Sequence, residues 1–153
     1  MNDDDSLFVD TNILLYSVDS GSPKKREQAW NWLTLFWEQR TGRLSWQVLH
    51  EFYANAERRL RLDRREARAI VEGYLRWSRV EMSFGLVQRA WHWMDQAQLA
   101  YWDGLILAAA EQSGCAWLLS EDFQPGRRYG SVTVINPLLK RPEEFGLKPA
   151  RRH

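Results

Sequence analysis

Short apolar segments alternate with longer helical ones along this chain, and that alternation limits its possible fold more than any other feature. Five segments have the composition of short, mostly buried strands: residues 7–10, 44–46, 80–82, 116–119 and 132–135. A helix or turn is expected at 11–18, and helices at 23–40, 47–60, 63–78, 85–98 and 103–113. Strands that alternate with helices form a parallel sheet covered by helices, so the sequence predicts an α/β fold.

Local signals mark where several of these helices begin. Ser22 is placed to cap the helix whose first turn contains Pro23, Ser45 to cap the helix at 47–60, and Asp63 opens the next one. The helix at 103–113 differs from the others, because residues 105–110, LILAAA, are apolar on all sides. A helix of that kind is buried in the protein interior.

Length and composition restrict the class of protein. A chain of 153 residues with no repeat or linker predicts a single domain at 1–153, with a core at about 7–137 and loose termini at 1–6 and about 142–153. One cysteine, Cys115, excludes an internal disulfide and a multi-cysteine zinc site. No apolar run approaches the roughly 18 residues of a membrane span. The acidic start, MNDDDS, differs from a signal peptide. We therefore expect a cytoplasmic protein with no membrane partner.

The net charge of +1 identifies no partner, but two local biases are open to more than one interpretation. Six arginines lie between residues 58 and 68, and they form either a solvated helix face or a patch that faces phosphates. Nine tryptophans are expected to pack in the core or at a dimer interface. Stacking on RNA bases is the alternative, although no RNA-reading motif supports it.

Acidic residues stand where the predicted strands end. Asp10 ends the first strand in LFVDTNILLY, and Asp122 follows the strand at 116–119 in LLSEDFQPG. Asp103 begins the apolar helix, and Glu51 lies in the helix after the second strand. Binding sites of open α/β sheets lie beyond the carboxyl ends of the strands, so these four side chains are expected to converge on one rim.

Each of these residues also has a purely structural explanation. Asp10 and Asp103 could cap their helices, because aspartate is a preferred capping residue and is stabilised near a helix N-terminus. Asp122 could be a turn residue. Glu51 falls away from the apolar face of its helix and could be a solvated surface side chain.

Considered together, the four carboxylates indicate a metal site. Two carboxylates about 4 Å apart repel by about 4 kcal/mol at an effective dielectric constant of 20, so proteins rarely gather several without a proton or a cation. No lysine or arginine lies within these motifs. Ligands that are all oxygen suit Mg²⁺ or Mn²⁺, and such an ion can activate water to hydrolyse a phosphodiester.

The same residues resemble a known family. The set VDTNILLY, Glu51 in a helix, and YWDGLILAAAEQSGCAWLLSEDFQPGRRYGSVTVINP is similar to the PIN domain, and in particular to the VapC-like ribonuclease toxins of bacterial toxin–antitoxin modules. The resemblance runs from about Leu7 to Pro137. It implies a three-layer α/β/α fold with a short parallel sheet and a carboxylate rim that binds Mg²⁺ or Mn²⁺.

The resemblance also assigns roles to the residues. It implies Asp10, Asp103 and Asp122 as metal ligands, with Glu51 as a fourth catalytic residue. Thr11, Asn12 and Ser120 would orient ligands or water. It further implies an endoribonuclease with an RNA substrate, a cognate antitoxin and a homodimeric assembly.

Three other functions stay open at this point. A stand-alone PIN-type RNA-processing nuclease would have the same motifs, and a catalytically inactive PIN-like interaction module would share the fold. A receiver-like signalling domain also binds Mg²⁺, but it needs an acidic pair on its first strand and a lysine near its last. Here Asp10 stands alone at the end of the first strand, and no lysine follows Asp122 before Lys140.

Overall fold

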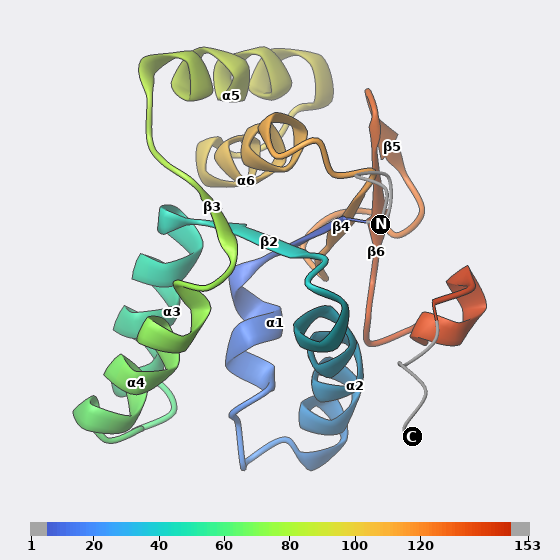
Figure 1. The fold of residues 1–153 in the computed structure, drawn as a ribbon. Helices are drawn as coiled ribbons and strands as arrows, with labels where there is room; N and C mark the ends of the chain where they lie inside the picture. Colours follow the sequence, from blue (N-terminus) through green and yellow to red (C-terminus); the bar gives the residue numbers. More distant parts are fainter. Residues whose placement is uncertain (1–5, 148–153) are drawn as a thin grey trace.

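The computed structural model of the chain describes residues 6–147, and in this part six strands form one sheet (Figure 1). In spatial order they are β3 (Ser78–Val80), β2 (Gly42–Ser45), β1 (Leu7–Val9), β4 (Trp117–Leu119), β6 (Val132–Ile135) and β5 (Arg128–Tyr129). All neighbouring strands are parallel except β5 and β6, which are antiparallel. The predicted parallel sheet is therefore confirmed.

Helices cover both faces of this sheet. In chain order they are α1 (Thr11–Tyr16), α2 (Pro23–Gln39), α3 (Trp46–Arg58), α4 (Arg64–Tyr74), α5 (Phe84–Ala97) and α6 (Tyr101–Gln112). Figure 1 shows α5 and α6 above the sheet and α1 to α4 below it. The arrangement confirms the expected three-layer α/β/α fold.

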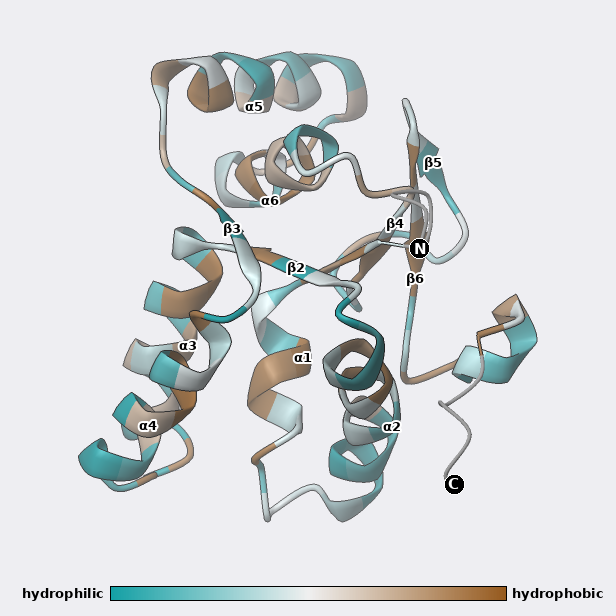
Figure 2. Ribbon diagram, viewed as in Figure 1, coloured by the Kyte–Doolittle hydropathy of each residue, from teal (hydrophilic) through white to brown (hydrophobic). Residues whose placement is uncertain are grey.

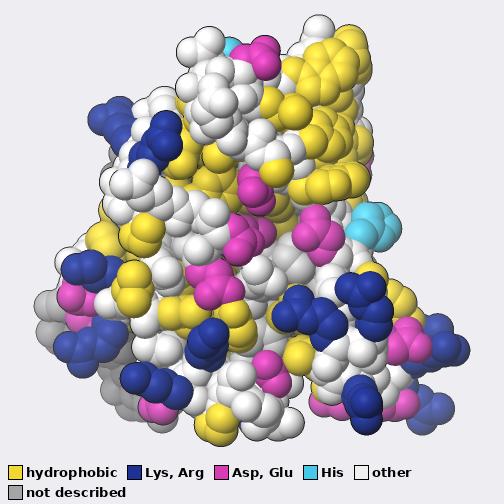
Figure 3. Space-filling model, turned by 180° about the vertical axis from the view of Figure 1, so that it is seen from behind, with side chains coloured by type: hydrophobic (Ala, Val, Ile, Leu, Met, Phe, Trp, Pro, Cys, Tyr) yellow, Lys and Arg dark blue, Asp and Glu magenta, His cyan; other side chains and the backbone are white. Residues whose placement is uncertain are grey.

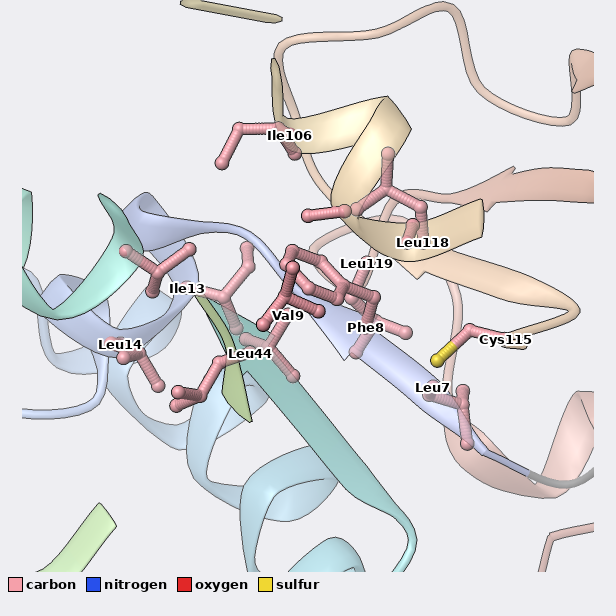
Figure 4. Close-up of a cluster of buried hydrophobic side chains, with 14 of the residues drawn as sticks. Leu7, Phe8, Val9, Ile13, Leu14, Leu44, Ile106, Cys115, Leu118 and Leu119 are labelled. Carbon is pink, nitrogen blue, oxygen red and sulfur yellow. The ribbon is translucent and has the colours of Figure 1, made fainter. Parts of the chain in front are cut away.

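The core lies where the central strands meet α6 and α1. Phe8, Val9 and Leu118 are buried completely, and Figure 4 shows them beside Leu44 and Ile106. Every residue of α6 from 104 to 110 is buried, as the apolar pattern of LILAAA predicts. Figure 2 shows the same contrast, because hydrophobic residues gather in α6 and the central strands while the outer face of α4 is hydrophilic.

Helices α5 and α6 pack with their backbones in close contact. A Cβ placed on Gly104 of α6 would lie 2.9 Å from the carbonyl oxygen of Ala90 on α5, closer than real Cβ contacts allow. Glycine at this position therefore lets α6 approach α5 directly after Asp103.

None of the described helices has the length and apolar character needed to cross a membrane.

Several details of the fold differ from the sequence prediction. Ser45 caps α3 by accepting a hydrogen bond from Val48 N at 3.3 Å, but the side chains of Ser22 and Asp63 make no capping bond. The short strand β5 was not predicted. It pairs through only two residues with β6, too few for a recognisable pattern.

The prediction of a loose C-terminal tail is wrong for the residues closest to the core. Pro142–Phe145 forms a 3-10 helix, and the Phe145 ring packs against Trp32 and Trp117 at centroid distances of 6.0 and 5.7 Å. Aromatic packing of this kind anchors the segment to α2 and β4. The rest of the predicted tail, residues 148–153, and residues 1–5 at the other end lie outside the described residues.

Candidate active site

Asp10 is fixed at the point where β1 passes into α1. Strands β1 and β4 are parallel and in register, with Val9 opposite Leu119, so the residues that follow them lie side by side. Asp10 Oδ2 accepts a hydrogen bond from Ser120 Oγ at 2.7 Å, and Oδ1 accepts one from the backbone N–H of Thr11 at 2.7 Å. Asp10 therefore does cap α1, as one alternative proposed, but it also faces the rim of the sheet.

Two of the other acidic residues are oriented by residues that follow Asp10. Thr11 Oγ1 donates to Glu51 Oε2 at 3.2 Å, and Asn12 Nδ2 donates to Asp122 Oδ2 at 3.1 Å. Gln47, one turn before Glu51 on α3, donates to Glu51 Oε1 at 2.7 Å. Glu51 is thus half-buried and hydrogen-bonded, which excludes the interpretation as a freely solvated surface residue.

Asp103 lies in the first turn of α6, but it does not cap that helix, because the N-cap position is Ala100. The capping explanation is therefore wrong for Asp103. Its side chain is half-buried, and burial raises its pKa first, followed by the negative charges of Asp122 and Glu51. Asp103 thus stands within electrostatic reach of Asp122, in the loop after β4, and of Glu51 on α3.

The electrostatics of the rim favour protons or cations. Burial raises the pKa of Asp10 to about 7 against the lowering effect of the Ser120 hydrogen bond, and the charges of Asp122 and Glu51 raise it further. The pKa of Asp122 is raised by burial and by Glu121, while the Asn12 hydrogen bond lowers it. Within residues 6–147, no ion pair with a lysine or arginine compensates these carboxylates. Protonation or a bound cation would therefore relieve the repulsion that these hydrogen bonds leave.

The donor set suits a hard divalent cation. In the described part of the chain, no three Asp, Glu, His or Cys side chains stand close enough together to form a ready-made metal cage. Mg²⁺ does not require such a cage, because it keeps several water molecules and binds proteins through one or two carboxylates. Asp10 is buried, Asp103 half-buried and Asp122 exposed. Carboxylates with raised pKa values and no cationic partner among the described residues fit that mode of binding. Figure 3 shows acidic side chains along the middle of the face, below an apolar area.

Comparison of the sequence with known families identifies the domain. Residues 7–129 match the PIN domain. The chain belongs to the PIN-domain family. Comparison with curated protein sequences gives no significant match.

Two solved structures share the fold of this PIN domain. A toxin–antitoxin complex from Klebsiella pneumoniae contains a chain that is 20% identical, with a TM-score of 0.64; the match covers 86% of this chain and 98% of that one. VapC20 of Mycobacterium tuberculosis, described as a toxin that cleaves the sarcin–ricin loop, is 19% identical with a TM-score of 0.52. That match covers 74% of this chain and 87% of VapC20. At these identities the comparisons establish the fold.

The sequence analysis did not single out three residues at the rim of this PIN domain, namely Gln47, Tyr16 and Glu121. Gln47 holds Glu51 and also donates to the backbone carbonyl of Trp102 at 3.2 Å, so it connects α3 with α6. Its position four residues before Glu51 is a signal that could have identified it, because such residues are neighbours on a helix. Tyr16 donates its phenolic hydrogen to Glu121, a contact across 105 positions that no local pattern indicates.

Proposed function

We propose that this PIN domain is a metal-dependent endoribonuclease and the toxin of a bacterial toxin–antitoxin module, neutralised in the cytoplasm by a cognate antitoxin. The observation that carries the proposal is the group of four acidic residues, Asp10, Glu51, Asp103 and Asp122, held at one rim without cationic partners among the described residues. Similarity in fold to a toxin–antitoxin complex and to VapC20 supports the biological assignment.

In this proposal the acidic residues have distinct roles. Asp10, Asp103 and Asp122 would hold Mg²⁺ or Mn²⁺, directly or through water, because carboxylate oxygens suit these ions. The positive charge would also offset the unfavourable interactions that raise the pKa values of these carboxyl groups. When bound there, the cation would lower the pKa of a water molecule and offset charge that develops on the phosphate. Glu51 accepts the proton of the attacking water at Oε1 or Oε2, with Gln47 and Thr11 fixing the orientation of its carboxylate.

The polar neighbours keep this geometry fixed. Ser120 Oγ donates to Asp10 and accepts a hydrogen bond from the backbone N–H of Asp122 at 3.0 Å, so one hydroxyl joins the two proposed ligands. Asn12 holds Asp122 from the other side. Side chains fixed in this way do not have to reorganise when substrate arrives, which is the main requirement for electrostatic catalysis.

The function is tested by incubating purified protein with total cellular RNA in the presence of Mg²⁺ or Mn²⁺. We expect discrete fragments from the wild type, and none with EDTA or with Asp10→Asn. Asp95→Asn, which changes an exposed aspartate on α5, is the matched control and should cleave normally. Equal cleavage by Asp10→Asn and the wild type would contradict the mechanism. No cleavage by any of them over a wide range of RNAs would favour an inactive interaction module.

The antitoxin is tested separately from cleavage. We expect the product of a small gene adjacent to this one to co-purify with the chain and to abolish cleavage at equimolar concentration. A nuclease that cleaves RNA without such an inhibitor would instead be a stand-alone RNA-processing enzyme.

We also propose that the chain is a homodimer joined through the exposed end of α5 and α6. Phe84, Trp91 and Trp102 are 65%, 48% and 62% exposed, and the rings of Phe84 and Trp91 pack edge to face at a centroid distance of 5.9 Å. An exposed apolar area of this kind is typical of a protein interface. Light scattering should give the mass of a dimer for the wild type and of a monomer for Phe84→Ser combined with Trp91→Ser. A wild-type monomer would refute the assembly.

A further inference from the structure

Tyr16 marks one end of the carboxylate rim. It is the last residue of α1, and its hydroxyl donates a hydrogen bond to Glu121, the neighbour of Asp122 in the chain. Burial raises the pKa of Tyr16 to about 12, with further contributions from the bond to Glu121 and from the charge of Asp122. The phenol therefore stays protonated at neutral pH.

Basic side chains lie beside this tyrosine. The Lys25 ammonium nitrogen, from the first turns of α2, is 4.9 Å from the centroid of the Tyr16 ring. Arg59, at the C-cap of α3, is close enough for its positive charge to lower the pKa of the Tyr16 phenol. Both cations are exposed, and neither forms an ion pair with a carboxylate within residues 6–147. Figure 3 shows basic side chains beside the lower part of the acidic band.

Three of the five other arginines in the 58–68 run make contacts within α3 and α4. Arg64 forms an ion pair with Glu57 at 2.8 Å, Arg68 donates to the Tyr53 hydroxyl at 2.9 Å, and Arg58 donates to Asn55 at 3.1 Å. These three contacts lie within the α3–α4 pair and do not reach the acidic rim. Arg59 differs from these three residues because its charge acts on Tyr16, beside the acidic rim.

We infer that Lys25 and Arg59 bind backbone phosphates of the RNA strand beside the cleaved bond, with the strand passing over Tyr16. This inference rests on the proposed ribonuclease function. The rim is acidic and repels a polyanion, so a substrate that reaches it must be held by cations nearby. Lys25 on α2 lies over the Tyr16 ring, and Arg59 at the C-cap of α3 acts on the Tyr16 phenol through its charge. Neither forms an ion pair among the described residues.

The inference is tested by the salt dependence of RNA binding. The probe is a fluorescein-labelled, 20-nucleotide single-stranded RNA of mixed sequence, with EDTA present so that binding is measured without cleavage. Full-length wild type is compared with Lys25→Gln, Arg59→Gln and the double variant by fluorescence anisotropy over a range of salt concentrations. Arg64→Gln is the control, since it removes the same charge from an exposed side chain of α4.

We expect each variant of Lys25 or Arg59 to reduce the slope of log K against log salt by about 0.7, the value for one phosphate contact on a single strand. For proteins that bind equally at 1 M salt, this change in slope makes binding at 0.1 M salt about fivefold weaker for each lost contact. The double variant should then bind about 25-fold more weakly than the wild type. The Arg64→Gln control should keep the wild-type slope. Thermal melting should be unchanged in all of them, because the substituted side chains are exposed.

An unchanged slope in the double variant, or an equal change in Arg64→Gln, would overturn the inference. A parallel cleavage assay separates this failure from failure of the proposed function. If the wild type cleaves RNA and the double variant binds and cleaves it normally, Lys25 and Arg59 do not contact phosphates. The proposed nuclease function is then still supported. If the wild type neither binds nor cleaves RNA, the proposed function fails and the inference with it.

Discussion

Replacing Asp10 with asparagine should make the metal-free protein more stable at alkaline pH. Burial raises the pKa of Asp10 from 3.8 to about 7, so the folded state binds a proton more tightly than the unfolded chain does. The stabilisation from protonated Asp10 is complete below the unfolded pKa and is lost as the pH rises through 7. At pH 8 a shift of about 3 units corresponds to about 4 kcal/mol of lost stability, at 1.36 kcal/mol per unit.

Asparagine has no charge to bury, but it cannot reproduce both hydrogen bonds of the carboxylate. Asp10 accepts from Ser120 and from the backbone of Thr11, and we assign about 1.5 kcal/mol to their weakening. The net gain at pH 8 is then about 2.5 kcal/mol, or about 5–10 °C in Tm for a chain of this length. At pH 5 the cost of burying Asp10 falls to about 1.5 kcal/mol, so the two proteins should melt at nearly the same temperature.

The assay is thermal unfolding in EDTA at pH 5 and pH 8, followed by circular dichroism. Asp95→Asn is the control, because Asp95 is exposed on α5 and its replacement should leave the pH dependence unchanged. Added Mn²⁺ should stabilise the wild type more than Asp10→Asn, since a ligand that binds only the folded state raises its stability. A variant that is less stable than the wild type at both pH values by the same amount would refute the electrostatic argument.

Three further substitutions test the supports of the site. Thr11→Val removes the hydroxyl that donates to Glu51 and should slow cleavage about tenfold, measured as kcat; a normal kcat would show that this bond is not needed. Ser45→Ala removes the cap of α3 and should lower the free energy of unfolding by about 1 kcal/mol in denaturant titration, whereas no change would contradict the cap. Gly104→Ala forces α5 away from α6 and should lower the free energy of unfolding by about 1–3 kcal/mol, measured in the same titration. Gly73→Ala in α4, where a Cβ meets no neighbour, should leave the free energy of unfolding unchanged or raise it. Equal effects of the two glycine substitutions would contradict the close packing.

The elements that could be predicted from the sequence are those whose pattern is local. The apolar helix from Asp103 and the strand Val132–Ile135 follow directly from runs of apolar residues, and both are found where expected. The convergence of Asp10 and Asp122 also follows, because parallel strands end at the same edge of a sheet. These predictions need only the order of the elements and not their contacts.

The parts that could not be predicted depend on contacts between distant residues. The helical wheel left Glu51 open between the rim and a solvated surface. It takes no account of Thr11, which lies 40 positions away and donates a hydrogen bond to Glu51. The ordered segment at Pro142–Phe145 is polar in sequence, and the packing of Phe145 against Trp32 becomes apparent only in three dimensions. In both cases tertiary contacts overrode the local pattern.

The run of arginines illustrates the same limit for function. Six similar residues in sequence appeared to be one surface, either solvated or facing phosphates. In the structure Arg64 pairs with Glu57, whereas the charge of Arg59 acts on Tyr16 at the acidic rim. Which of these two arginines acts on the acidic rim therefore depends on tertiary contacts and not on the local sequence.

The most direct test of the account is to cleave RNA in water enriched in ¹⁸O and to determine the fragment ends by mass spectrometry. If the carboxylate rim directs hydrolysis by an activated water molecule, each cleavage should leave a linear phosphate monoester that carries one oxygen from the solvent. Fragments that end in a 2′,3′-cyclic phosphate without solvent oxygen would show attack by the ribose hydroxyl. That result would contradict the proposed role of Asp10, Asp103 and Asp122.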